Sequence, residues 1–365
     1  MRNLFTAFFL LFSLGWPSLS PLQAQQVDAR EETQARELRA EVTSILSETR
    51  VEGIRQMVFE AKTDEGALYQ IDTSQGYVEG LRYRIHRGSR VFLQVVPSED
   101  GTSVAYLVDV DRSGSIFLII ALFALAAVGV GFWRGFFALI GLGTTLAILF
   151  LFIFPQILTG ADPVFVTVLG AVGMLAINMP LSHGFKKETL AALSATIAGL
   201  GLAVLFTYLF VWLANLSGVA SEEASLLQAK SGLLADPQGI LLAAIILGAV
   251  GVLDDVTIAQ SEAAIELRRA NPSLSRKELF LSAMRLGRHH IASTVNTLVL
   301  AYVGSAMPLF LLFLYTHSET ASFFLNTENV AEEIVRTLAG TTALILTIPL
   351  ATLISVWISA RPKKS

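Results

Sequence analysis

The sequence predicts an all-α multi-pass membrane bundle of about seven transmembrane helices, preceded by a small extracytoplasmic β domain. Of its 365 residues, 53% are hydrophobic and only 15% are charged, whereas soluble domains carry about 25% charged residues. Residues 115–359 contain seven apolar segments, each long enough to cross a hydrocarbon core of about 30 Å. Residues 25–113 are polar and contain short runs of alternating hydrophobicity instead.

Residues 1–24 have the pattern of a secretory signal peptide or an N-terminal anchor. Arg2 precedes an apolar run from Leu4 to Leu14, and Ala24 stands where cleavage would follow. Leu22 is a poor residue two positions before that point, so an uncleaved anchor is the alternative. In both cases we expect the next segment outside the cytoplasm.

Residues 25–113 are predicted to form a small extracytoplasmic β domain with a helix at its start. The stretch from Val27 to Glu48 is rich in charge and favours a helix. Short β-like runs separated by glycine follow and predict a small closed barrel or a compact sheet. These runs are 57–61, 68–72, 81–86, 91–96 and 104–110. His86 is the only histidine there, and we interpret it as an exposed strand residue.

Residues 114–360 are predicted to be the transmembrane helical domain, and residues 361–365 its cytoplasmic tail. Arg134-Gly135 and a short loop from Pro155 to Pro163 separate the first three apolar segments, which predicts antiparallel helical hairpins. The predicted spans are 115–133, 136–154, 163–181, 190–214, 239–260, 291–315 and 337–359.

The distribution of basic residues predicts the orientation of these spans. If residues 25–113 are outside, the segments on the inner side hold twelve Lys and Arg residues, and the short outer loops hold only Lys230 and Arg336. This is a strong positive-inside bias. The sequence therefore predicts a multi-pass membrane protein with its C-terminus in the cytoplasm.

The longest inner loop contains a predicted basic helix. Ser275 and Glu278 fit a capping box, and Leu279, Ala283 and Leu286 recur at helical spacing. The helix is expected either to lie amphipathically in the membrane surface or to pack on the bundle as an ordinary basic helix.

The stretch GAVGVLDDVTIAQSEA, residues 248–263, places two carboxylates directly after an apolar run. On a helix, Asp254, Thr257 and Ser261 share one face, while Asp255 and Glu262 share another. Carboxylates within a membrane are costly and commonly belong to proton or ion pathways. The pair therefore predicts a proton or cation relay, and the alternative is that the helix ends near Leu253 with both aspartates solvated.

The segment 291–315 offers polar partners for this pair. Ser293, Asn296 and Thr297 lie on one side of its start, at a similar membrane depth to Asp254 in the antiparallel neighbour. Such residues commonly hydrogen-bond between membrane helices. We therefore predict that they support the relay, with simple stabilisation of helix packing as the alternative.

Other kinds of chemistry are not indicated. The chain has no cysteine, and it contains no glycine-rich phosphate loop, zinc-binding helix motif or serine elbow. We expect no enzymatic activity, no cofactor and no metal site. A net charge of −4 argues against a nucleic-acid partner. Any transport is expected to be driven by ions or by another subunit.

Several motifs resemble the YibE/F-like membrane proteins of bacteria. They are LLAAI at residues 241–245, the stretch 248–263, NPSLSRKELF, LGRHHI and NTLVLAYVGSAMP, which together cover about residues 160–360. The resemblance implies a protein of the bacterial cytoplasmic (inner) membrane with an N-terminal hydrophobic segment, a small outer domain and about seven helices. It also implies an acidic residue at Asp255. His289 departs from an acidic position of the family, so no role is assigned to it.

A more distant likeness connects the same stretch to the proton-relay helix of resistance-nodulation-division transporters. In those proteins an Asp pair carries the proton, which implies this role for Asp254 and Asp255. Their basic membrane partner has no counterpart here, because no predicted span contains Lys or Arg in its interior.

The leading hypothesis is a secondary permease of the lipid bilayer that is coupled to protons or cations through Asp254 and Asp255. The competing hypothesis is a membrane scaffold or accessory protein that does not transport, and whose outer domain binds an envelope or membrane protein partner.

Overall fold

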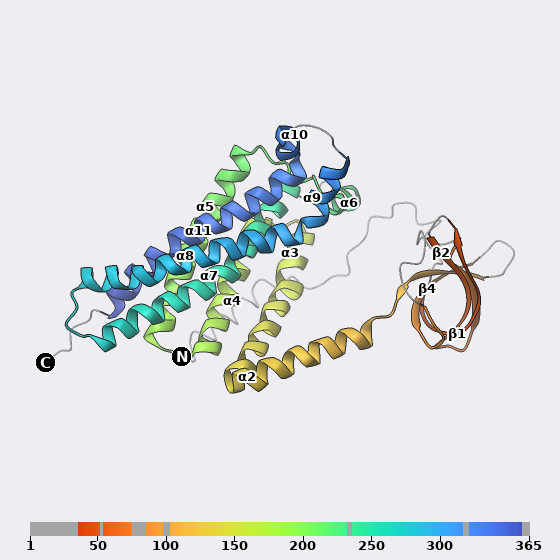
Figure 1. Ribbon diagram of the computed structural model, residues 1–365, viewed down its shortest axis with the longest axis horizontal. Helices are drawn as coiled ribbons and strands as arrows, with labels where there is room; N and C mark the ends of the chain where they lie inside the picture. The colour runs from red at the N-terminus through yellow and green to blue at the C-terminus, as the bar shows by residue number, and fades with distance from the viewer. Residues whose placement is uncertain are drawn as a thin grey trace. The chain divides into compact units, whose positions relative to one another are not determined.

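The computed structural model describes residues 36–51, 54–74, 85–97, 103–231, 236–316 and 321–359 (Figure 1). The chain divides into two compact units, Met1–Leu122 and Phe123–Ser365, which are considered separately. The predicted signal segment 1–24 and tail 361–365 lie outside the described residues.

The first unit contains one five-stranded antiparallel sheet with the order β3-β2-β1-β4-β5, curled into a half-barrel (Figure 1). Alternate side chains point inward, so Met57, Phe59, Ile71, Leu93 and Leu107 are almost fully buried. The strands are β1 (Arg36–Val51), β2 (Ile54–Thr63), β3 (Leu68–Asp72), β4 (Arg90–Pro97) and β5 (Ser103–Val110).

The helix predicted from Val27 to Glu48 is wrong where the structure describes it, because Arg36–Val51 is a strand. Its charged residues alternate with Ala40 and Val42, which are buried. A period of two with one buried face is the pattern of a strand, and charge content obscured it.

The other predicted strands are largely confirmed. The runs 57–61, 68–72, 91–96 and 104–110 fall within β2, β3, β4 and β5. Residues 81–84 of the remaining run lie outside the described residues, and residues 85 and 86 form no strand. His86 is exposed, as expected, but it lies just before a turn instead of in a strand.

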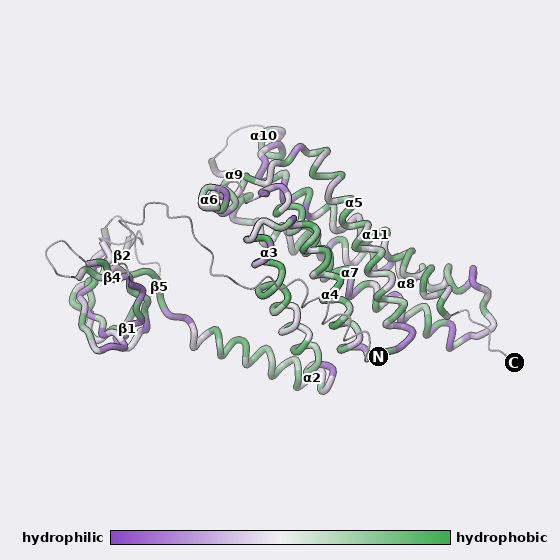
Figure 2. The backbone as a smooth tube through the Cα atoms, turned by 180° about the vertical axis from the view of Figure 1, so that it is seen from behind, coloured by the Kyte–Doolittle hydropathy of each residue, from purple (hydrophilic) through white to green (hydrophobic). Residues whose placement is uncertain are grey.

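From Ser113 onward, the described chain is helical. Figure 2 shows long hydrophobic stretches in these helices and hydrophilic segments toward some of their ends. The helices are α2 (Ser113–Ile148), the π-helical turn η1 (Leu149–Ile153), α3 (Phe154–Leu158), α4 (Pro163–His183), α5 (Lys187–Leu213), α6 (Glu222–Ser231), α7 (Pro237–Ala270), α8 (Arg276–Ser305), α9 (Met307–Thr316), α10 (Ala321–Asn326) and α11 (Glu328–Ser359).

Five helical stretches of the described chain are long and apolar enough to cross a membrane, or six if α8 and α9, bent by 61°, form one span. The first two predicted spans belong to one stretch, Ser113–Leu158, which is broken at Phe132 (φ 49°). Figure 1 shows this sharp bend beside the α2 label. The bend lies close to the predicted boundary at Arg134-Gly135, and the number of seven spans stays a prediction.

The bundle is organised around α5, α7 and α11, which pack against one another, with α4 and α8 against them. Ile245, Leu253, Leu344 and Ile348 are at most 1% exposed in its core. A Cβ at Gly199 of α5 would lie 2.5 Å from the Thr347 hydroxyl of α11. The glycine therefore allows two membrane helices to approach closely, as small residues commonly do.

The predicted basic helix is the first part of α8. Its capping box is confirmed: Ser275 and Glu278 exchange hydrogen bonds of 2.8 and 3.2 Å. Leu279 and Ala283 are completely buried, and the helix continues without a break to Ser305. This supports a helix packed on the bundle instead of a separate helix lying in the membrane surface.

Candidate functional site

The Asp pair lies in the interior of α7, which continues to Ala270. The alternative that the helix ends near Leu253 is therefore wrong. The helix continues because its apolar face is still buried beyond the pair, at Val256, Ile258 and Ile265. Two arginines in the last turn also interact favourably with the helix dipole.

The predicted division of α7 into two faces is confirmed. Asp254 is half-buried and Thr257 and Ser261 are fully buried, whereas Asp255 and Glu262 are exposed. The Oδ1 atom of Asp254 is buried and has no hydrogen-bond partner among the described residues. Of the two carboxylates, Asp254 is therefore the one directed into the bundle.

A hydroxyl pair joins α7 to α5 about one turn C-terminal to Asp254. The Oγ1 atoms of Thr257 and Thr196 are 2.5 Å apart. Thr257 is also placed to donate to the carbonyl oxygen of Asp254 at 3.1 Å, and Thr196 to that of Ala192 at 2.9 Å. Because each hydroxyl has one proton, two protons serve three contacts. The hydrogen-bond direction at this pair can therefore reverse without any movement of heavy atoms.

A second polar group follows on α7. The Gln260 amide donates to the carbonyl oxygen of Ala283 at 3.0 Å and to the Thr352 hydroxyl at 2.8 Å, which links α7 to α8 and α11. The Gln260 Oε1 atom and the hydroxyls of Ser261 and Ser355 are buried without partners among the described residues. An unsatisfied buried polar group costs about 1–3 kcal/mol.

The unpartnered atoms of this column are two that normally only accept hydrogen bonds and two hydroxyls that can also donate. Asp254 Oδ1 and Gln260 Oε1 can only accept, unless the carboxyl is protonated. Gln260 lies about 9 Å further along the helix axis than Asp254. A proton, a cation or water molecules would satisfy these atoms, so the arrangement suits the passage or binding of positively charged species.

Sequence reasoning did not find Thr196, Gln260, Thr352 and Ser355. A signal was available, because Thr257, Gln260 and Ser261 fall on one side of α7, as do Thr352 and Ser355 on α11. A single polar residue in an apolar span is common, and only the packing shows that these side chains meet.

The structure does not bring the predicted partners on α8 to the Asp pair. Ser293, Asn296 and Thr297 are exposed, and in the described chain none of them hydrogen-bonds to either aspartate; Thr297 donates to the Ser293 carbonyl at 3.0 Å. Gly287 faces Gln260, and Asn296 is nine residues further on. That distance is about two and a half turns, which places Asn296 on the opposite side of α8.

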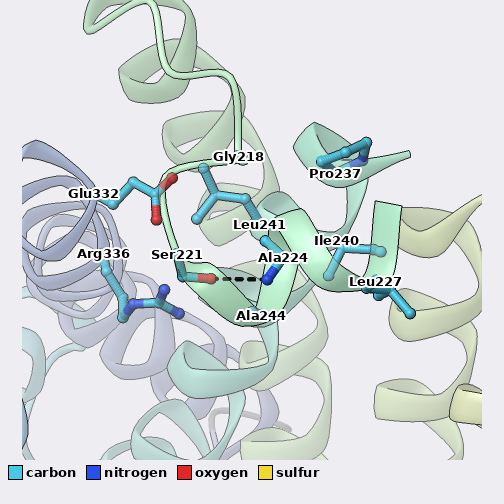
Figure 3. A pocket seen from close by; sticks show the side chains of 10 residues that line it. All are labelled: Gly218, Ser221, Ala224, Leu227, Pro237, Ile240, Leu241, Ala244, Glu332 and Arg336. Atoms are coloured by element: carbon cyan, nitrogen blue, oxygen red, sulfur yellow. Dashed lines mark hydrogen bonds between the residues drawn. The ribbon is translucent and has the colours of Figure 1, made fainter. Parts of the chain in front are cut away.

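Cavities lie at both ends of this helical unit. Where α7 and α11 begin, a cavity of about 120 Å³ is lined by Glu332 and Arg336 (Figure 3). At the opposite end, a cavity of about 530 Å³ is lined by basic residues and by the buried Glu188, which pairs with Arg269. Within the part of the chain that the structure describes, no cluster of three or more His, Asp or Glu residues could hold a metal ion.

A family model described as YibE/F-like protein matches residues 119–361. The chain belongs to the YibE/F-like family. The match contains the Asp pair, the hydroxyl pair and both cavities, and it leaves out the β sheet. No curated protein and no solved structure matches the chain. Family membership and the apolar helices indicate a multi-pass membrane protein, whereas the likeness to resistance-nodulation-division transporters stays a prediction.

Proposed function

We propose that this YibE/F-like protein is a secondary permease of the bacterial inner membrane, coupled to protons or cations through Asp254 with Asp255 beside it. The observation that carries the proposal is the buried, unpartnered Oδ1 of Asp254, one helical turn from the Thr257–Thr196 hydroxyl pair on the same face of α7. A carboxyl that can be protonated, near hydroxyls that can reverse their hydrogen bonds, is a suitable start for a proton relay.

The column of polar residues supports a path along α7. From the cavity at the start of α7, the path would pass Asp254, the hydroxyl pair and Gln260, and reach the basic cavity near Arg268 and Arg269. In the proposed orientation, the first cavity faces outward and the second faces the cytoplasm, in agreement with the positive-inside rule. Asp255 and Glu262 would serve as exposed charges beside the path.

Proton flux into proteoliposomes tests this function. Vesicles that contain a pH-sensitive dye and the purified protein should acidify when a potassium diffusion potential is imposed. Asp254→Asn keeps the size of the side chain and removes its titratable proton, so flux should fall to the level of protein-free vesicles. Glu266→Gln is the matched control, because Glu266 is an exposed carboxylate of the same helix that pairs with Arg269. Equal flux in both variants would exclude Asp254 as the coupling group.

The β sheet gives a specific reason to keep the second candidate function, a scaffold whose outer domain binds a partner. β3 and β5 end the sheet in the described chain, and Leu68, Val104 and Val108 on them are at least 38% exposed. Exposed apolar side chains on the surface of a sheet are candidate contacts for a partner protein. Expression of residues 1–113, which include the predicted signal segment, in a deletion strain should restore the phenotype if the protein is a scaffold, and should fail if transport is required.

A further inference from the structure

The cavity at the start of α7 and α11 has the features of a ligand site. A loop that contains Gly218 and Ser221 covers it, and the remaining walls come from α6, α7 and α11 (Figure 3). Gly218 has a positive φ of 79°, and a Cβ there would lie 2.4 Å from the Pro237 carbonyl oxygen. Glycine is therefore required for the loop to lie against the start of α7 and close the cavity.

Glu332 is a buried carboxylate at this cavity with unused hydrogen-bonding capacity. The residue is only 8% exposed. Its Oε1 atom is buried without a hydrogen-bond partner among the described residues. Figure 3 shows the carboxylate directed toward the loop at Gly218. A buried carboxylate stays ionised only with further donors or a positive charge nearby.

The described charged groups that act on Glu332, namely Arg336, Glu328 and Glu333, are more negative than positive. Arg336, which also lines the cavity, has its Nε 3.3 Å from Glu333 Oε1. Glu328 accepts from the backbone N–H groups of Ser217 and Gly218, at 2.5 and 3.3 Å. Three carboxylates thus surround one guanidinium, which favours a cationic ligand over an anionic one.

The rest of the lining restricts the size and chemistry of that cation. Leu227, Ile240, Leu241 and Ala244 provide apolar walls. The cavity has a volume of about 120 Å³. The Ser221 hydroxyl, which accepts from the Ala224 N–H at 3.1 Å, retains a further lone pair.

We propose that this cavity binds a small primary ammonium cation. Its ammonium group donates hydrogen bonds to the Glu332 carboxylate and Ser221 Oγ, and its short alkyl part lies against Leu241 and Ala244. The role of such cations as transported substrates rests on the proposed permease function. Binding itself does not, because it requires only the cavity and Glu332.

Calorimetric titration of the full-length protein in detergent tests the proposal, with n-propylammonium chloride as the probe and sodium chloride at equal ionic strength as the reference. Propylammonium should bind and sodium should not. Glu332→Gln should weaken binding at least about tenfold, as expected for the loss of a charge-assisted hydrogen bond. Glu223→Gln, which removes an exposed carboxylate from α6, should bind like the wild type.

A second variant separates loss of the site from loss of the fold. Ala244→Leu fills the cavity without any change of charge, and should abolish binding while circular dichroism and gel filtration stay unchanged. The proposal is overturned if the wild type does not bind propylammonium, if sodium gives the same heat, or if Glu332→Gln binds as tightly as the wild type. Proton flux that depends on Asp254 could persist in all three cases, so failure of this inference is distinct from failure of the proposed function.

Discussion

Replacement of Gly199 by alanine should force α5 and α11 apart. The new Cβ would lie 2.5 Å from Thr347 Oγ1, 2.7 Å from its Cγ2 and 3.2 Å from its Cβ. Thr347 is fully buried, and its branched side chain is held because its hydroxyl donates to the Ala343 carbonyl at 2.7 Å. Threonine therefore cannot rotate away without loss of this hydrogen bond, and the helices must move instead.

The size of the effect follows from two opposing terms. Overpacking of a well-packed core costs about 1–3 kcal/mol, whereas glycine to alanine in a helix gains up to about 1 kcal/mol. Gly201→Ala is the matched control, because it lies on the same helix and its Cβ would meet nothing within 4 Å. Both variants share the propensity gain, so the difference between their free energies of unfolding, about 1–3 kcal/mol, isolates the clash.

Reversible unfolding in mixed micelles, followed by circular dichroism, measures this difference. Thr347→Ala removes the two atoms below 3 Å, so the double variant Gly199→Ala/Thr347→Ala should recover part of the stability lost in Gly199→Ala. The reasoning is refuted if Gly199→Ala is as stable as Gly201→Ala, or if the effects of the two substitutions simply add.

Two further predictions concern other parts of the chain. Gly135→Ala should prevent the bend in α2, because its Cβ would lie 2.0 Å from the Ala127 carbonyl oxygen. Gly129→Ala is the control and should be tolerated, because a Cβ there would meet nothing within 4 Å. Limited proteolysis should therefore give a changed cleavage pattern for Gly135→Ala and the wild-type pattern for Gly129→Ala. The hydrogen bond from Arg112 lowers the pKa of Asp109 below its ordinary value. A depressed carboxyl pKa stabilises the fold above the unfolded pKa of about 3.8 and loses that effect as the pH falls through the folded pKa. An NMR titration of the carboxyl carbon should therefore show the pKa rise in Arg112→Gln, and an unchanged pKa would contradict this assignment.

The sequence by itself determined the features that depend on local periodicity. The apolar spans, the capping box of Ser275 and Glu278, and the common face of Asp254, Thr257 and Ser261 all follow from the spacing of residues along one helix. Four of the five predicted strands followed from alternation in the same way. The error at β1 arose where charge content was given more weight than alternation.

Only the tertiary structure decided which faces of different helices meet. The sequence does not show that Thr196 of α5 meets Thr257, or that Thr352 of α11 meets Gln260. Nor does it show that Asn296 points away from the Asp pair. The rotation of a helix about its axis is fixed by close packing against its neighbours, here by Gly287 and other small or buried residues. Because each helix packs against several others, its rotation cannot be deduced from its own segment of the sequence.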